Sequence, residues 1–295
     1  MRFCAKKQAE KIIMKKRRFV CFRIDLIFKR DKIYTSTFRS DNMRIAIITA
    51  MAEEALPIFK KFGNVVAQNT ISGVSISQIE QGANTIYLAT SGVGEIKAAL
   101  AVQLLVDLFD VETVLNFGFV GAINRNLDLC ELVAVGRVCH YQFDVTEVDT
   151  DRSVGQYSGM SDNYFYLDQT LLSNVLANVG KPVKVVTCAS GDKFVANKQD
   201  KERLKKDFGA DICEMELAGL AIACERNNIP LLSIKVVSDK AEEGANVSFV
   251  SIVEKGIAGY EKILPAILEA LTSGASSLPP VKKPRGSVAC VKDKD

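Results

Sequence analysis

The sequence has few of the side chains on which many enzyme sites depend. It contains one histidine, His140, in 295 residues. A Ser-His-Asp or Cys-His nucleophile system would therefore have to use that residue, and a multi-histidine metal site is excluded. The eight cysteines include no C-x-x-C pair, which argues against a zinc site or a redox motif. We expect any proton chemistry to depend on carboxylates, without a metal or another cofactor.

Long apolar runs are also missing. No run reaches the roughly 18 residues that a membrane-spanning helix needs, and the N-terminal segment lacks the features of a secretory signal. Cys130, Cys188, Cys213 and Cys224 lie in apolar runs, as small core residues of a protein in a reducing compartment do. These features predict a cytoplasmic protein that does not bind a membrane.

Charge is distributed unevenly along the chain. Residues 1–42 hold 13 Lys and Arg against 4 Asp and Glu, whereas the remaining chain holds 25 against 31. The net charge of +3 thus hides a mildly acidic main part and gives no case for binding nucleic acid. A basic segment of this kind suits a mitochondrial presequence, but its aspartates weaken that interpretation.

The composition also predicts the domain boundaries. We expect residues 1–42 to be a basic extension outside the fold, or to result from translation that starts upstream of Met43. Residues 43–272 are expected to form one domain. Residues 273–295 contain three of the seven prolines and are expected to be a disordered tail.

Apolar runs and glycine-containing turns alternate through residues 43–272. The pattern predicts an α/β fold, a three-layer sandwich with a central mixed, mostly parallel sheet flanked by helices. The expected strands are 44–50, 74–79, 84–90, 111–116, 131–139, 142–148, 183–189 and 229–237, with a short strand before residue 217. The expected helices are 53–62, 95–109, 167–179, 198–208, 217–224 and 247–271.

Polar or glycine-containing turns follow several of these strands. The carboxyl ends of parallel strands meet at one edge of an open sheet, where ligands bind, so we expect these turns to form one pocket. One of them, 91–94, lacks the third glycine of a dinucleotide fingerprint, which disfavours a nicotinamide site. The turns are Glu53-Glu54, Ser91-Gly-Val-Gly94, Asn116-Phe-Gly118, Ser190-Gly-Asp192, Glu214-Met-Glu216 and Ser238-Asp239.

The stretch 211–225 is the most informative of these places. A short strand is expected to run into a helix whose small residues, including Gly219, permit close approach to a neighbour. Glu214 and Glu216 stand between the two elements. From the residues alone they could be ligand-binding carboxylates or solvated residues of the first helical turn.

The other candidates also have structural alternatives. Glu54 could be a solvated residue of a first helical turn. Asp239 could cap a short helix at 240–243. Phe194 could belong to the core, and His140 is expected to be structural.

The order and spacing of seven segments resemble the methylthioadenosine/S-adenosylhomocysteine nucleosidases of the nucleoside phosphorylase superfamily. The resemblance covers residues 43 to about 271. The segments are Ile45-Ala-Ile-Ile-Thr-Ala-Met-Ala-Glu-Glu54, Ser91-Gly-Val-Gly94, Asn116-Phe-Gly118, Asp144-Val-Thr146, Ser190-Gly-Asp-Lys-Phe194, Cys213-Glu-Met-Glu216 and Val237-Ser-Asp239.

The resemblance implies roles for eight residues. Glu54 would help to activate an attacking water, and Asp239 would protonate or hydrogen-bond the five-membered-ring nitrogen of the purine. Glu216 would bind the ribose hydroxyls. The remaining five would complete the substrate site: Met215 beside the sugar, Phe194 stacked on adenine, the backbone of Val195 at the base edge, Ser91 near the water or phosphate position, and Ser238 supporting Asp239.

These residue types suit cleavage of an N-glycosidic bond. Positive charge develops on the ribose and negative charge on the departing purine, so a carboxylate near the sugar and an acid at the ring nitrogen both stabilise the transition state. A water molecule between the catalytic base and the sugar would resemble the arrangement in inverting sugar hydrolysis. Asp239 would have to be protonated when it acts, and burial can arrange this by raising its pKa.

The nucleophile can also be predicted. Phosphorolysis needs a dianion held by arginines and backbone amides. Related phosphorylases have an arginine where this chain has Asn116, and the nearest candidate here is Arg125. We therefore expect water to attack an adenine nucleoside. The alternatives are a purine nucleoside phosphorylase and a non-catalytic nucleoside-binding protein of the same fold.

Two segments depart from the family pattern. Phe119-Val-Gly-Ala122 replaces small residues, and Tyr141-Gln-Phe143 stands where the family has His-Asp. These changes leave the 5′-substituent open: methylthio, homocysteinyl, hydroxyl or a futalosine-like group. The resemblance also implies a homodimer in which the neighbouring subunit closes the 5′ end of the pocket, with Phe, Tyr and Val near residues 117–143 as candidate interface residues.

Overall fold

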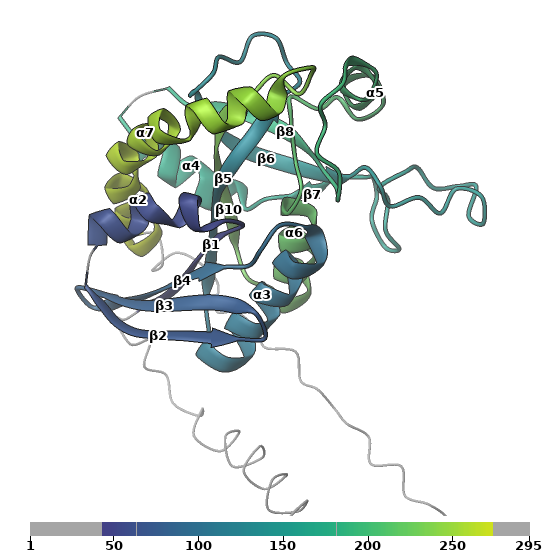
Figure 1. Ribbon diagram of the computed structural model, residues 1–295. Helices are drawn as coiled ribbons and strands as arrows, with labels where there is room; N and C mark the ends of the chain where they lie inside the picture. Colours follow the sequence, from purple (N-terminus) through teal and green to yellow (C-terminus); the bar gives the residue numbers. More distant parts are fainter. Residues whose placement is uncertain (1–42, 63, 181, 274–295) are drawn as a thin grey trace, which may run out of the picture. The chain divides into compact units, whose positions relative to one another are not determined.

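Strands and helices alternate along the chain, as the pattern of apolar runs predicts (Figure 1). The computed structural model describes residues 43–62, 64–180 and 182–273, so the predicted extension 1–42 and residues 274–295 of the predicted tail lie outside the described residues. The strands are β1 (Arg44–Thr49), β2 (Val65–Ile71), β3 (Val74–Gln81), β4 (Asn84–Thr90), β5 (Thr113–Ala122), β6 (Leu132–His140), β7 (Phe165–Tyr166), β8 (Lys184–Ser190), β9 (Ile212–Glu214) and β10 (Leu231–Asp239). The helices are α2 (Ala52–Phe62), α3 (Glu95–Phe109), α4 (Gln169–Asn178), α5 (Lys198–Phe208), α6 (Leu217–Asn227) and α7 (Ala245–Ser273).

The strands form one mixed sheet, part of which closes on itself. The order is β10-β6-β8-β9-β5-β1-β4-β3-β2, and an additional pairing of β10 with β5 completes a barrel. The α/β class and the mixed sheet are confirmed. The predicted sandwich is wrong, because part of the sheet closes into a barrel. The sheet is also not mostly parallel, since five of the ten pairings in the described chain are antiparallel. Register shifts in the β10–β5 and β6–β8 pairs provide the local bending and twist that closure needs.

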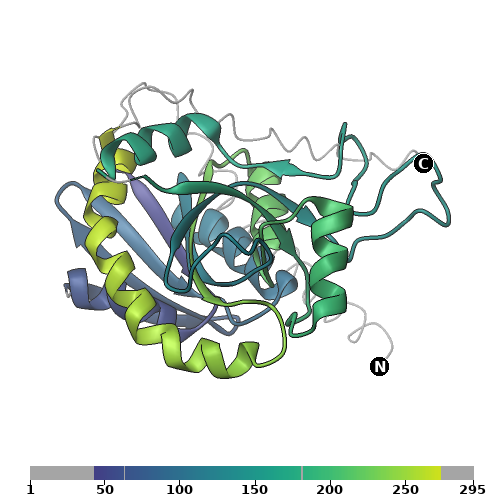
Figure 2. The same cartoon turned by 90° about the horizontal axis from the view of Figure 1, so that it is seen from above.

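Helices cover the sheet in two groups. α3 and α6 pack against each other over one face, whereas α7 contacts both α2 and α4 over the other face (Figures 1 and 2). Each group encloses its own apolar cluster with the strands. Among the helices of the described chain, none has the length and apolar character that crossing a membrane requires.

One predicted strand does not form, and two strands, β2 and β7, were not predicted. Residues 142–148 form turns, because Oδ1 of Asp144 accepts hydrogen bonds from the backbone N–H (3.0 Å) and hydroxyl (2.7 Å) of Thr146, and such local bonds compete with a strand ladder. The segment 141–164 projects away from the barrel (Figures 1 and 2). β2 was not predicted because most of its residues are exposed and its sequence does not alternate.

β5 continues through its glycines to Ala122 instead of stopping at Asn116. A Cβ at Gly118 would lie 3.0 Å from Oε1 of Glu54, and one at Gly121 would lie 2.9 Å from Oδ1 of Asp239. The glycines therefore do not end the strand. They leave room for carboxylates that lie against it.

α3 and α6 approach each other closely at Gly219. A Cβ at this position would overlap the backbone carbonyl of Glu95, so a side chain cannot be accommodated while the helices keep their spacing. This is the close approach that the sequence predicts. It brings the starts of the two helices together.

Replacing Gly219 with alanine tests this contact. We expect Gly219→Ala to lower the free energy of unfolding by about 3 kcal/mol, because the added methyl group overpacks the helix interface. Gly259→Ala in α7 is the matched control, since its Cβ would meet only the Leu132 side chain, at 3.8 Å, and alanine favours a helix by up to about 1 kcal/mol. Urea denaturation measures both changes, and equal effects would contradict the crowding at Gly219.

Candidate active site

One cavity, of about 190 Å³, collects residues from six separate segments of the chain. Seven of the eight predicted site residues line it. They come from α2 (Glu54), the loop before α5 (Phe194 and Val195), the β9–α6 junction (Met215 and Glu216) and the end of β10 (Ser238 and Asp239). The lining is completed by Ala50, Met51, Val93, Phe119, Val120, Gly121, Lys193, Cys213 and Glu214.

Ser91 is the predicted residue that the structure does not place in the lining. Its side chain is buried, and its hydroxyl lies 3.2 Å from the carbonyl oxygen of Thr49 and 2.9 Å from that of Gly92. The backbone of the turn after β4 thus engages this hydroxyl. The turn reaches the cavity through Val93 instead.

Glu54 lies in the first turn of α2, but it is buried rather than solvated. Oε2 accepts hydrogen bonds from the backbone N–H groups of Ala50 (2.8 Å) and Met51 (3.0 Å), and Oε1 accepts one from Phe119 (3.1 Å). Burial raises the pKa of Glu54, although the ammonium group of Lys235 and these three N–H groups oppose the shift. The interpretation as a solvated first-turn residue is wrong.

Asp239 is the last residue of β10 and is also buried. Oδ1 accepts a hydrogen bond from the backbone N–H of Ala241 (2.8 Å), and Oδ2 accepts one from the Ser238 hydroxyl (2.9 Å). No helix forms at 240–243, so Asp239 is not a helix cap. Burial raises its pKa despite these hydrogen bonds, which favours the protonated form that an acid needs.

Glu216 follows β9 at the N-cap position of α6, where its side chain makes no capping hydrogen bond. Instead, Oε1 accepts a hydrogen bond from the backbone N–H of Gly94, at 3.0 Å. Burial and the nearby charge of Glu214 raise the pKa of Glu216 to about 8, and Lys235 opposes them. The carboxyl group therefore reaches the cavity from the junction of two helix starts.

Sequence reasoning gave no role to the buried ion pair at the base of the site. The ammonium nitrogen of Lys235 lies 3.0 Å from Oε2 of Glu214, and both side chains are 2% exposed. Burial lowers the pKa of Lys235, but Glu214, Glu216 and Glu54 together raise it above its ordinary value. The available signal was a single charged residue within the apolar strand 231–237, because a buried lysine needs a partner.

The mouth of the cavity carries an exposed aromatic ring. Phe194 is 48% exposed, so its assignment to the core is wrong, and it follows Lys193 in a loop. The ammonium group of Lys193 pairs with Asp200 at 2.6 Å, which fixes the loop to α5. Val195 beside them is buried.

The lining offers no uncommitted cation for a phosphate dianion. Its two lysines, Lys193 and Lys235, each pair with a carboxylate, and it contains no arginine. Arg125 lies outside the lining and pairs with Glu202 at the surface. Within the described residues, no group of three or more His, Cys, Asp or Glu side chains is arranged to hold a metal ion.

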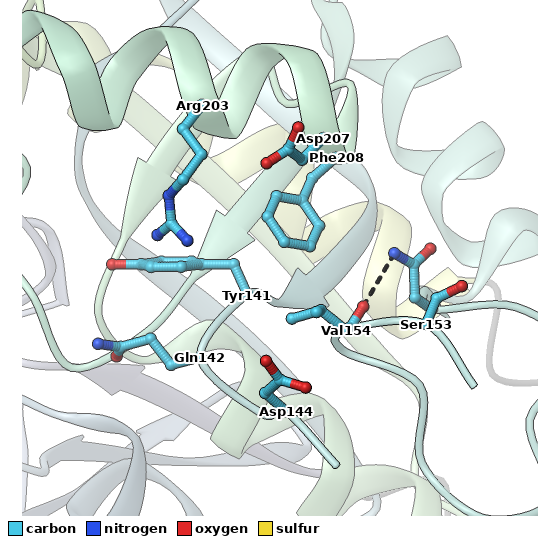
Figure 3. Close-up of a pocket in the computed structure, with 9 residues that line it drawn as sticks. Tyr141, Gln142, Asp144, Ser153, Val154, Arg203, Asp207 and Phe208 are labelled. Atoms are coloured by element: carbon cyan, nitrogen blue, oxygen red, sulfur yellow. Dashed lines mark hydrogen bonds between the residues drawn. The ribbon is translucent and has the colours of Figure 1, made fainter. Parts of the chain in front are cut away.

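A larger cavity, of about 580 Å³, lies beside the projecting segment 141–164 (Figure 3). The guanidinium group of Arg203 lies over the ring of Tyr141, 5.8 Å from its centroid. The two aspartates of this cavity, Asp144 and Asp207, are exposed to solvent. Size alone would favour this cavity, but buried carboxylates occur in the smaller one.

The residues that depart from the family pattern occupy different places. Phe119 lines the small cavity, whereas Phe143 stacks on Tyr157, with ring centroids 3.8 Å apart. His140 lies outside the lining, and its Nδ1 is 2.8 Å from the Tyr157 hydroxyl. Of the two departing segments, only the one at 119–122 lines the small cavity, through Phe119, Val120 and Gly121.

Comparisons with known proteins identify similar chains that match this one over nearly their whole length. Aminodeoxyfutalosine nucleosidase of Campylobacter jejuni is 27% identical over 225 residues, which cover 72% of this chain and 92% of that protein. The 5′-methylthioadenosine/S-adenosylhomocysteine nucleosidase of Buchnera aphidicola is 29% identical over 233 residues, with coverage of 78% and 99%.

Solved structures agree with these sequence matches. The native structure of futalosine hydrolase of Helicobacter pylori matches with a TM-score of 0.72 at 27% identity, covering 77% of this chain and 97% of that one. The 5′-methylthioadenosine/S-adenosylhomocysteine nucleosidase of Streptococcus pneumoniae, solved with the transition-state inhibitor MT-ImmA, matches at 0.71 and 29%, with coverage of 78% and 100%.

The family profile described as "Phosphorylase superfamily" matches residues 44–271. This range contains every residue that lines the small cavity. The chain belongs to the phosphorylase superfamily.

Proposed function

We propose that this protein hydrolyses the N-glycosidic bond of adenine nucleosides such as 5′-methylthioadenosine and S-adenosylhomocysteine. The products are adenine and the thioribose compound, and water is the nucleophile. The observation that carries the proposal is that Glu54, Glu216 and Asp239, which are far apart in the sequence, line one cavity. The similar proteins named above as nucleosidases support the same reaction class.

Asp239 is the proposed acid at the purine. As the glycosidic bond breaks, its electron pair goes to the purine, and a proton from Asp239 neutralises the developing charge on the ring nitrogen. The raised pKa keeps that proton in place. Ser238 and the backbone of Ala241 orient the carboxyl group.

Glu54 and Glu216 act at the sugar. In its anionic form, Glu216 accepts hydrogen bonds from the ribose hydroxyls and stabilises the positive charge that develops on the ring, while Glu54 accepts a proton from the attacking water. Three backbone N–H groups fix the Glu54 carboxyl group, so little reorganisation is needed when water attacks. Phe194 stacks on the adenine, the Val195 backbone contacts the base edge, and Met215 packs beside the sugar.

Water, rather than phosphate, fits the charges of the cavity. A phosphate dianion would lie among Glu54, Glu214 and Glu216 with one buried cation, Lys235, that already pairs with Glu214. Repulsion between the dianion and neighbouring carboxylates would cost several kcal/mol at the effective dielectric of a protein interior, of order 20. A neutral water molecule avoids this repulsion.

Release of adenine without phosphate is the first test. We expect purified protein to liberate adenine from 5′-methylthioadenosine in phosphate-free buffer, at a rate that added phosphate does not raise. A panel of S-adenosylhomocysteine, adenosine, inosine and aminodeoxyfutalosine, assayed by chromatography, identifies the 5′-substituent and the base. Strict dependence on phosphate, with ribose 1-phosphate products, would overturn the proposal in favour of a phosphorylase.

Asp239→Asn tests the acid. We expect kcat to fall about 10²- to 10⁴-fold, because asparagine cannot supply a proton to the purine. In the parent protein, kcat should fall as pH rises through the raised pKa of Asp239, since only the protonated form acts. The control is Asp207→Asn in the larger cavity, which should retain parental kcat.

The same variant separates catalysis from binding. If the parent turns over none of the nucleosides and Asp239→Asn binds them with the parent's affinity, the protein is a nucleoside-binding protein of this fold. Calorimetric titration with 5′-methylthioadenosine provides that affinity.

We also propose that the protein is a cytoplasmic homodimer. Ile96 and Leu100, one turn apart on α3, are 72% and 62% exposed, and Val93 just before α3 lines the cavity. An exposed apolar surface that continues into a site favours a protein contact there. Of the Phe and Tyr residues expected at the interface, Phe117, Phe119 and Tyr141 are buried within the subunit, whereas Phe143 is half-buried.

Light scattering tests this dimer. We expect the parent to have the mass of two subunits and Ile96→Asp/Leu100→Asp to be a monomer, because aspartates in a dry interface repel each other. The monomer should have a higher KM, since the neighbouring subunit no longer closes the pocket. The control, Val66→Asp on exposed β2, should remain a dimer. A parent that is monomeric and fully active would remove the proposal.

A further inference from the structure

The start of α6 is held by side chains from three other places in the chain. The first N–H groups of a helix have no partner within the helix. Here Leu217 donates to Glu214 (3.0 Å), Ala218 to the Ser190 oxygen (3.0 Å) and Gly219 to Oε2 of Glu95. These three contacts replace the usual cap, and they leave the carboxyl group of Glu216 available to the cavity.

The hydrogen bonds around Ser190 require one proton more than its own hydroxyl group supplies. Its oxygen is in hydrogen-bond contact with Oε1 of Glu95 and with Oε1 of Glu214, the latter at 2.5 Å, and it accepts the N–H of Ala218. A serine hydroxyl has one hydrogen and can donate to only one of the two carboxyl groups. The other carboxyl group must itself be protonated and donate to Ser190, because two bare acceptors at this distance repel each other.

The surroundings assign that proton to Glu95. Glu214 pairs with Lys235 and accepts N–H groups of Glu216 and Leu217, all of which favour a carboxylate anion. Among the described residues, no cation lies at hydrogen-bond distance from the Glu95 carboxyl group, which accepts one N–H, from Gly219, through Oε2. Its Oε1 is thus the donor to Ser190, whose own hydrogen points to Glu214.

We propose that Glu95 is a positioning residue that carries a proton at neutral pH and, through Ser190 and Glu214, fixes the start of α6 so that Glu216 faces the substrate. The chain of contacts runs from Glu95 through Ser190 and Glu214 to Lys235. The kinetic part of this inference rests on the function proposed above. The protonation of Glu95 does not.

The electrostatic surroundings agree with this assignment. Burial, followed by the charge of Glu214, raises the pKa of Glu95 to about 8. A second anion beside Glu214 would also disfavour the anionic form of Glu216. The titratable or charged groups that face Glu95 are Asp192, which accepts its backbone N–H, and Glu214, Glu216, Tyr141 and Tyr157.

Glu95→Gln is the informative variant because glutamine has the shape of the protonated acid. Its amide nitrogen can donate to Ser190, and its oxygen can accept from Gly219. Glu53→Gln, an exposed residue of α2, is the matched control for loss of one carboxyl group. Infrared difference spectra at pH 7 should show loss of a protonated-acid C=O band in Glu95→Gln and loss of a carboxylate band in Glu53→Gln.

Thermal unfolding gives a second measurement that does not need turnover. Glu95 keeps its proton up to about pH 8 in the folded protein but loses it near its ordinary value of 4.5 when unfolded. Its contribution to stability therefore decreases as pH rises between these values. We expect the Tm of Glu95→Gln, relative to the parent, to rise between pH 5 and pH 8, whereas the difference for Glu53→Gln should stay constant.

Kinetics test the positioning role. We expect Glu95→Ala to raise KM about tenfold, because the start of α6 and Glu216 lose a hydrogen-bonded support, and Glu95→Gln to restore parental KM at pH 7. The KM of the parent should rise above pH 8, as Glu95 ionises, whereas that of Glu95→Gln should not.

The outcomes separate the two proposals. Loss of a carboxylate band in Glu95→Gln, or KM profiles that are parallel to those of the parent, would overturn the role of Glu95. If the infrared and Tm results are as expected but none of the nucleosides is cleaved, the protonated Glu95 stands and the proposed hydrolysis fails.

Discussion

The ion pair between Lys235 and Glu214 is the interaction on which the rest of the site depends. Glu54 and Glu216 also act on the Lys235 ammonium group, which has almost no exposure to solvent. Uncompensated buried carboxylates are costly, and breaking such a pair leaves a charge without a partner. One lysine in the middle of an apolar strand therefore permits several acidic groups to meet around a single cavity. The protonation of Glu95 likewise avoids an uncompensated buried carboxylate, at a position further from the cavity.

Backbone N–H groups also stabilise the carboxyl groups of the cavity. N–H groups of the turn before α2, of β5 and of the turn after β4 bind Glu54 and Glu216, and the turn after β10 binds Asp239. Glycines in β5 let two of these carboxyl groups lie against the strand, and Gly219 lets α3 and α6 meet. Because these contacts are all made by the protein itself, they hold the acids in position for a reaction in which charge develops in the transition state.

The carboxyl groups of the cavity differ in a way that suits the splitting of a nucleoside. Asp239 has a raised pKa and lies where β10 ends, whereas Glu54 lies in the first turn of α2 and is fixed by three backbone N–H groups. The proposed acid and base thus come from different elements of one cavity, so they can act on the purine and on the sugar of the same molecule. The larger cavity beside the projecting segment has no such division, because its aspartates are exposed.

Much of the architecture follows from local sequence, since periodicity and turn residues depend on near neighbours. The strand 84–90 and the helices 95–109 and 198–208 have the bounds that their patterns predict, and the polar turns that end the strands supply most of the cavity. Barrel closure, the passage of β5 through its glycines, and the burial of Glu54 depend on residues far away in the chain, so a local pattern could not reveal them. The same is true of the contact that joins Glu95 to Ser190, 95 positions later. The sequence contains both residues, but only the folded chain brings the start of α3, the end of β8 and the start of α6 together, so that Ser190 contacts both helices.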